Sequence, residues 1–329
     1  MKTIAFFNNK SGVGKTSLVY HLAWMYSELG IHVIAADFDP QANLTSMFIE
    51  EGRLEELWPN GDHPDSVLGA IKPILKGTGD IRIPHLEPIS EGLGLIVGDL
   101  GLSGFEDKLS EAWLRCQDRD ETAFLVISAL YRIVKMAAEK NEADVALIDV
   151  GSNLGAINRA ALIASDYVVV PLGDDIFSLQ GLKNVGPTIR LWRDLWKTRL
   201  DHWAHPEFEL PQGRMIPLGY TAQQHGVQFP IKSYDKWLNR MPGAYHQYIL
   251  EESTDAATPA NDPHCLGILR PFRSLKEMAK EARKPIFKLK PADGAIGSHS
   301  EAVAQVYKDF KRLAERLLGG MKEFNTSAQ

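Results

Sequence analysis

The 329-residue sequence predicts an α/β fold in which a doubly wound, mostly parallel sheet is covered by helices on both faces. Two observations predict this fold class. Short apolar runs rich in β-branched residues recur along the chain without polar alternation, as is typical of strands that are buried on both faces. The first two runs are separated by a glycine turn and a helical pattern, so together they form a βαβ unit.

The elements follow in chain order. Runs of strand length span residues 3–7, 32–39, 144–150, 166–172 and 215–220. Between the first two runs, apolar residues recur at helical spacing from Leu18 to Leu29, and Gly30 supplies a C-terminal stop. Residues 104–142 have a helical pattern, and a shorter one occupies residues 233–251. These patterns predict a sheet whose strands are joined by helical crossovers.

Near the end of the chain, one helical face carries a set of apolar residues: Val303, Val306, Phe310, Leu313 and Leu317. We expect this helix to pack on the fold and not to bind a membrane, because Asp309 and Glu315 make it partly acidic. We interpret residues 1–329 as a single domain. It carries an elaboration at residues 50–95, with an acidic start and Pro/Gly-rich turns, and a loop-rich insertion at residues 198–264.

Composition excludes several classes of protein. No run of 18 or more uncharged apolar residues is present, which argues against a membrane-spanning chain. The two cysteines, Cys116 and Cys265, are far apart and show no metal-ligand spacing, as expected of a protein in a reducing compartment. The net charge of −6 argues against a uniformly basic surface for nucleic acid. We therefore expect a cytoplasmic globular protein.

The segment NNKSGVGKTS, residues 8–17, directly follows the first predicted strand and opens a helix. A backbone that turns at Gly12 and Gly14 and then starts a helix directs several free N–H groups to one point, where the helix dipole favours an anion. Lys15 would neutralise β- and γ-phosphates, and the Thr16 hydroxyl is a natural Mg²⁺ ligand. The candidate nucleotide-binding residues are Lys10, Ser11, Gly12, Val13, Gly14, Lys15, Thr16 and Ser17.

The segment departs from the ordinary phosphate-binding pattern because Asn9 stands where glycine is usual. Lys10 instead heads KSGVGKTS, which resembles the deviant Walker A motif K-G-G-x-G-K-[ST] of the ParA/MinD family of P-loop ATPases. Three more blocks resemble that family: AADFDPQANLTS at 35–46, DVALIDVGSNLGAINRAALIASDYVVVPL at 144–172, and DDIFSLQGLKNV at 174–185. The resemblance covers residues 1 to about 190, and DPQAN makes it most similar to ParA-type partitioning ATPases.

The resemblance implies ATP and Mg²⁺ as cofactors and hydrolysis of ATP to ADP and phosphate, slow and stimulated by a partner. The implied catalytic residues are Lys15, Asp39, which would orient the attacking water, and Lys10, which would reach the nucleotide of a second subunit. The implied metal-site residues are Thr16, Asp37 and Asp149. Two departures qualify the match. Val150, Gly151 and Ser152 replace a threonine and two prolines, and TAQQH lacks an expected asparagine, so no base contact is assigned.

Residues 269–290 are basic within an acidic protein, with eight Lys or Arg residues against two Glu. In ParA-like proteins, basic residues in this part of the fold bind DNA without sequence preference, through phosphate contacts that need only clustered positive charge. The DNA-binding candidates are Arg270, Arg273, Lys276, Lys280, Arg283 and Lys284. The alternative for the same residues is a solvated helix face without a partner.

The expected function is that of an ATP-dependent dimerising ATPase that segregates or positions a cargo, such as a plasmid, a chromosome region or a large assembly. The expected partners are a second copy of the chain, non-specific DNA, and an activating adaptor of ParB type or a cargo protein; the ATP-bound form would associate with the nucleoid. One alternative is a nucleotide-gated recruitment or regulatory module that acts on a protein partner without DNA. A metabolic P-loop enzyme, with a substrate pocket in residues 198–264, is a further alternative.

Overall fold

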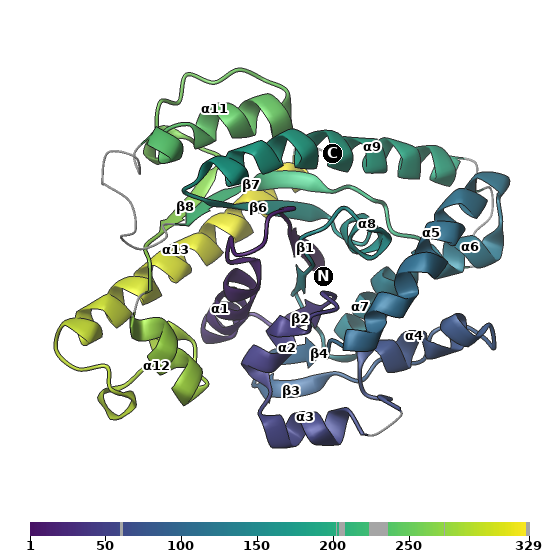
Figure 1. Cartoon of the computed structure of the whole chain (residues 1–329), viewed down its shortest axis with the longest axis horizontal. Helices are drawn as coiled ribbons and strands as arrows, with labels where there is room; N and C mark the ends of the chain where they lie inside the picture. Colours follow the sequence, from purple (N-terminus) through teal and green to yellow (C-terminus); the bar gives the residue numbers. More distant parts are fainter. Residues whose placement is uncertain (60–61, 202, 204–207, 224–235, 273, 327–329) are drawn as a thin grey trace.

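The computed structural model describes residues 1–59, 62–201, 203, 208–223, 236–272 and 274–326 (Figure 1). The strands of these residues form one eight-stranded sheet in the order β3-β4-β2-β5-β1-β6-β7-β8. Neighbouring strands are parallel except for the antiparallel pair β3 and β4. The strands are β1 (Lys2–Phe6), β2 (Val33–Asp37), β3 (Glu87–Ser90), β4 (Leu93–Ile96), β5 (Val145–Asp149), β6 (Tyr167–Gly173), β7 (Ile216–Gln223) and β8 (Cys265–Leu269).

Helices cover both faces of the sheet (Figure 1). One face is covered by α1 (Lys15–Glu28), α2 (Asn43–Phe48), α3 (Glu51–Leu57), α12 (Ser274–Ala282) and α13 (Ser298–Thr326). The other face is covered by α4 (Val67–Lys76), α5 (Phe105–Arg115), α6 (Glu121–Ile127), α7 (Ala129–Lys140), α8 (Ala156–Ile163), α9 (Ile176–Asp201) and α11 (Met241–Tyr245). Each face therefore has its own apolar core.

Strand β1 shows why its sequence is apolar throughout. Ile4 and Phe6 pack into the core on the α1 side, whereas Ala5 and Phe7 pack into the core on the α9 side, and all four are fully buried. Because side chains alternate along a strand, only a strand covered on both faces needs apolar residues at every position. The predicted doubly wound α/β fold is confirmed.

The sequence does not predict β3, β4 or β8. Strand β3 begins with Glu87 and Pro88 at the sheet edge, where its partner is antiparallel, and the short strands β4 and β8 are interrupted by Gly94 and Gly267. None of the three reads as a β-branched apolar run. Residues 50–95 therefore contribute the edge strand β3 and most of its neighbour β4 to the main sheet, besides the helices α3 and α4.

The C-terminal helix α13 packs as its apolar pattern predicts. Val306, Phe310, Leu313 and Leu317 are buried against the same core as α1. In the part of the chain that the structure describes, no helix has both the length and the apolarity needed to cross a bilayer. The observed packing accounts for the apolar face of α13.

The carboxyl ends of β1, β2 and β5 meet in the middle of the sheet. Asp37 of β2 and Phe6 of β1 both lie in register with Asp149 of β5. In open α/β sheets, ligands bind in the crevice beyond the carboxyl ends of such strands. The fold thus brings residues 8–17, the segment after β2 and the segment after β5 to one place.

Candidate nucleotide-binding site

The phosphate-binding loop (P-loop), residues 8–17, joins β1 to α1. Gly12 and Gly14 adopt left-handed conformations, with φ of 75° and 78°. Gly14 is the N-cap residue of α1, and among the described residues no side-chain cap bond is made at the helix start. A Cβ atom on Gly14 would also lie 2.0 Å from Oε1 of Gln223, at the end of β7. The loop therefore requires glycine here and leaves backbone N–H groups at the N-terminus of α1 for an anion.

Lys15 reaches from the first turn of α1 to the loop after β5. It is 6% exposed, and its Nζ donates a hydrogen bond to Oγ of Ser152 at 2.6 Å and a longer one to the Lys10 carbonyl at 3.4 Å. Burial lowers the pKa of Lys15, and the carboxylates of Asp149 and Asp39 oppose that shift. A phosphate would add a further negative charge beside this buried amine.

Asp149, at the end of β5, is fully buried, and neither carboxylate oxygen makes a hydrogen bond with a described residue. Burial and the neighbouring Asp37 carboxylate raise the pKa of Asp149 well above its usual range, while Thr16 and Lys15 nearby favour the ionised form. A buried carboxylate without donors is costly unless a cation or bound water satisfies it. Asp149 and the Thr16 hydroxyl therefore fit a Mg²⁺ site, whose preferred ligands are oxygens.

Asp37 lies beside Asp149 but is occupied by hydrogen bonds. Its Oδ2 accepts from the backbone N–H and the hydroxyl of Thr45, both at 2.8 Å, and its Oδ1 accepts from the Asp39 N–H at 3.2 Å. Burial raises the pKa of Asp37 to about 7 despite these bonds. The residue holds the β2–α2 connection in place behind the site.

Asp39 is half-buried on the segment after β2 and lines the cavity described below. Its Oδ1 accepts a hydrogen bond from the Gln41 N–H at 3.0 Å. A Cβ atom on Gly151 would lie 3.5 Å from the same oxygen, so the carboxylate faces the loop that follows β5. Asp39 follows β2, Ser152 follows β5 and Lys15 begins α1 after β1, so three separate segments contribute to the site.

Lys10 pairs within its own chain. Its Nζ lies 2.6 Å from Oδ2 of Asp175, and both side chains are about 30% exposed. Asp175 also accepts hydrogen bonds from the N–H groups of Phe177 and Ser178, at 2.8 and 3.1 Å, and so caps the start of α9. Burial opposes ionisation of Asp175, but the hydrogen bonds from Lys10 and these amides hold its pKa below the usual value. Asp175 therefore links Lys10 to α9.

Other contacts of the P-loop are missed by the sequence. The buried Asn8 donates to the Pro171 carbonyl of β6 at 2.8 Å and accepts from the Lys10 N–H at 3.0 Å. Gln223 Nε2 lies 3.4 Å from the Gly14 carbonyl. Gln223, the last described residue of that part of the chain, thus contacts the P-loop. Pro171 and Gln223 stand far from the P-loop in sequence, so no local pattern predicts these two contacts.

A cavity of about 1100 Å³ opens beside the P-loop, between α1, the segment after β2, the loop after β5 and α12. Its volume is that of a site for a molecule of nucleotide size. The predicted residues on its wall are Ser11, Gly12, Gly14, Lys15, Thr16, Ser17, Asp39, Lys276, Lys280, Arg283 and Lys284. Val13 is buried beneath the loop, and Asp37 and Asp149 lie below the wall.

The basic stretch borders this cavity. Lys276 and Lys280 are exposed on α12, whereas Arg283 donates to the Ile49 carbonyl at 2.9 Å and Lys284 forms an ion pair with Asp293 at 2.8 Å. Arg270 is exposed after β8, and Arg273 lies outside the described residues. Part of the predicted DNA-binding cluster is thus engaged within the protein, and its α12 portion faces the P-loop.

Comparison with known proteins agrees with this geometry. The AAA domain family matches residues 1–202. Protein IncC of Escherichia coli is 31% identical over 189 residues, which are 57% of this chain and 46% of IncC. The chromosome partitioning protein ParA of Caulobacter vibrioides is 29% identical over 202 residues, which are 61% of this chain and 67% of that protein. The chain thus spans about half to two thirds of the length of these relatives.

The fold likeness extends over the whole chain. Protein DIP2308 from Corynebacterium diphtheriae superposes with a TM-score of 0.69 at 21% identity, covering 97% of this chain and 98% of that one. The glycine turn, the buried Lys15 and the aspartates of β2 and β5 lie where the matched sequence blocks predict them. The sequence match and the geometry therefore indicate the same family. The chain belongs to the ParA/MinD family of P-loop ATPases with a deviant Walker A motif.

Proposed function

We propose that the protein binds ATP with Mg²⁺ in the cavity beside the P-loop and hydrolyses it slowly to ADP and phosphate. The observation that carries this proposal is the convergence of the α1 N-terminal amides and the buried Lys15 amine at one cavity, with the unsatisfied Asp149 carboxylate below its wall. A triphosphate complements the first two groups, and a divalent cation complements the third.

The residues of the chain would divide the work. The P-loop amides and Lys15 would bind the phosphates and stabilise the charge that spreads over the γ-phosphate oxygens in the transition state. Asp39 faces the loop after β5 and would orient the attacking water. Thr16 and Asp149 would hold Mg²⁺, with Asp37 fixing the segment behind them. When bound, Mg²⁺ would neutralise β- and γ-phosphate charge.

We further propose that two copies of the chain, residues 1–329 acting as one ATPase domain, dimerise when ATP is bound, with Lys10 of each copy completing the site of the other. Lys10 is outside the cavity wall and pairs with Asp175 in its own chain, so it would have to leave Asp175 to reach a second copy. Dimerisation switched by ATP would let the protein segregate or position a cargo in the cytoplasm, with an adaptor or cargo protein stimulating hydrolysis.

Sedimentation velocity tests the switch. We expect the wild-type protein and an Asp39→Ala variant to be monomeric with ADP and to form dimers with ATP and Mg²⁺. The variant dimer should persist longer, because it binds ATP but hydrolyses it about 100-fold more slowly. A Lys15→Gln variant should stay monomeric under all conditions. If the wild-type and Asp39→Ala proteins both remain monomeric with ATP, the switch is wrong.

We propose that the ATP-bound dimer binds DNA without sequence preference through the exposed cations of the basic stretch, Arg270, Lys276 and Lys280 above all. Their exposure supports this proposal. The position of Lys276 and Lys280 on the cavity wall supports the alternative, in which these lysines serve the nucleotide and the dimer recruits a protein partner without DNA.

A gel shift on arbitrary duplex DNA separates the two. If α12 binds DNA, a Lys276→Gln/Lys280→Gln variant should bind duplex more weakly, with a salt slope lower by about 2, because each lost phosphate contact removes about 0.9. Its KM for ATP should be unchanged. The matched control, Lys76→Gln/Lys140→Gln, removes two exposed lysines from α4 and α7 and should behave as wild type. A raised KM with unchanged DNA binding would favour the recruitment module.

A further inference from the structure

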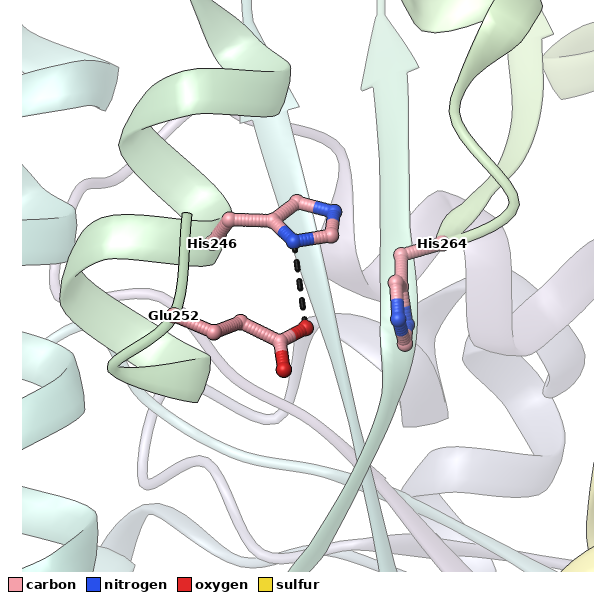
Figure 2. Close-up of side chains that lie close together, drawn as sticks. All are labelled: His246, Glu252 and His264. Atoms are coloured by element: carbon pink, nitrogen blue, oxygen red, sulfur yellow. Dashed lines mark ion pairs between the residues drawn. The ribbon is translucent and has the colours of Figure 1, made fainter. Parts of the chain in front are cut away.

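Three side chains with metal-binding atoms converge away from the nucleotide cavity. His246 opens the π-helical turn His246–Leu250 that follows α11. Glu252 is the second residue after that turn, and His264 immediately precedes β8. Figure 2 shows His246 and Glu252 turned toward one another and His264 on the opposite side of the gap. One ligand atom from each of the three lies within 4.8 Å of the others.

Asp262 fixes the proton on His246. This buried carboxylate accepts a hydrogen bond from the His264 backbone N–H at 3.0 Å and from the Tyr220 hydroxyl at 2.9 Å. His246 Nε2 lies 3.1 Å from the same carboxylate and therefore carries the proton that it donates. In a neutral ring, Nδ1 must then hold a lone pair.

The lone pair on Nδ1 lies next to the Glu252 carboxylate, which is also a hydrogen-bond acceptor. Nδ1 of His246 is buried and makes no hydrogen bond with a described residue, although it lies 3.2 Å from Oε1 of Glu252. The two atoms are close but lack hydrogen-bond geometry, so even a protonated Nδ1 would not form a hydrogen bond with Glu252. A cation bound to both atoms would account for the 3.2 Å separation, because two ligands of a tetrahedral ion with bonds of about 2.0–2.1 Å lie about 3.3 Å apart.

We propose that His246, Glu252 and His264 bind a divalent transition-metal ion of the zinc class, with Asp262 orienting His246. Two imidazoles and one carboxylate suit zinc better than magnesium or calcium, which prefer oxygen ligands alone. A ligating histidine commonly donates its other N–H to a carboxylate, as His246 does to Asp262. With three protein ligands and an exposed Glu252, a fourth position stays open to solvent.

The backbone that carries the ligands is held in place by α9. Arg190 donates to the carbonyls of Tyr248 and Ile249 at 2.8 and 3.0 Å and pairs with Glu251 at 2.9 Å. Gly186 allows this close approach, since a Cβ atom there would lie 1.8 Å from the Tyr248 carbonyl oxygen. π-Helical turns occur frequently at functional sites. The turn that carries His246 and leads to Glu252 is thus held by contacts that involve none of the three proposed ligands.

Metal titration tests the proposal on the full chain. Zn²⁺ would be titrated against a chromophoric chelator at neutral pH, with excess Mg²⁺ present and no nucleotide, and Co²⁺ binding would be followed by its visible absorption. We expect one high-affinity Zn²⁺ per wild-type chain and a tetrahedral Co²⁺ spectrum. Glu252→Gln and Asp262→Asn should each weaken Zn²⁺ binding by about 10- to 100-fold.

The matched control is Glu251→Gln, which neutralises the neighbouring glutamate. Arg190 keeps its bonds to the Tyr248 and Ile249 carbonyls in this variant, so the turn stays in place and wild-type Zn²⁺ affinity is expected. At one fixed, low concentration of free Zn²⁺, the melting temperature of the wild-type and Glu251→Gln proteins should rise more than that of Glu252→Gln, because stabilisation falls as Kd rises. Because Glu252 is exposed, its substitution should leave the metal-free fold intact, which circular dichroism can verify. Equal Zn²⁺ affinity in the wild-type and Glu252→Gln proteins, or the lack of a tetrahedral Co²⁺ spectrum, would overturn the proposal.

Discussion

A Lys15→Gln substitution is expected to lower kcat/KM for ATP hydrolysis by about 10²–10³-fold, the usual cost of losing one preorganised charge stabiliser. The structure gives the reason. The Lys15 ammonium is almost completely buried at the head of α1, and the carboxylates of Asp149 and Asp39 favour its charged form. Glutamine is uncharged and one atom shorter than lysine but keeps most of its aliphatic stem and a polar end, so the fold should survive.

Ser152→Ala is the matched control because it removes the other partner of the same 2.6 Å hydrogen bond and leaves the ammonium in place. Because the ammonium and its charge stay at the site, loss of this one hydrogen bond should lower the activity much less than Lys15→Gln does. Steady-state phosphate release by the Lys15→Gln and Ser152→Ala variants measures the two losses of activity. Near-wild-type turnover by Lys15→Gln would remove the central support for ATP hydrolysis at this cavity.

A Lys10→Gln variant is expected to be as inactive as Asp39→Ala when each is assayed alone, yet a mixture of the two should regain activity. In a mixed dimer, the nucleotide on the Lys10→Gln copy would meet an intact Asp39 of its own chain and an intact Lys10 from the Asp39→Ala copy. About half of the dimers would be mixed, each with one complete site, so the mixture should reach about a quarter of wild-type turnover.

The same mixture tests the contact that the structure places within one chain. If Lys10 acted only through its 2.6 Å pair with Asp175, neither copy could supply what the other lacks, and mixing would restore nothing. An Asp175→Asn variant is a useful companion, because it releases Lys10 while keeping an acceptor at the start of α9. Measured turnover across mixing ratios therefore separates action within a chain from action between chains.

The sequence predicts the centre of the fold because the physics there is local. Strands β1, β2, β5 and β6 are buried on both faces and read as apolar runs, and the P-loop combines a glycine turn with a helix start in ten consecutive residues. Strands β3, β4 and β8 are short, stand toward the edges of the sheet and contain proline or glycine. Pairing with neighbouring strands, which no single segment reveals, makes them strands.

The contacts that shape the two sites are long-range. Lys15 and Ser152 are 137 residues apart, and Lys10 and Asp175 are 165 apart, so neither pair produces a pattern in the sequence. The basic stretch is visible as composition, but its position beside the cavity depends on how α12 packs. His246 lies in the short helical pattern of residues 233–251, and Glu252 and His264 lie in the loop-rich segment that follows it. Only the folded chain brings Asp262 to His246.

The closeness of α9 to the π-helical turn has a consequence for the whole histidine cluster. Gly186 of α9 faces the Tyr248 carbonyl of the turn, about sixty residues further along the chain. A methyl group at position 186 would collide with that carbonyl oxygen, so the absence of a side chain allows the two segments to lie this close. Even a Gly186→Ala substitution would push the turn away from α9 and move His246 relative to His264 and Asp262. The geometry of an ion site would thus be governed from a helix position that supplies none of its ligands.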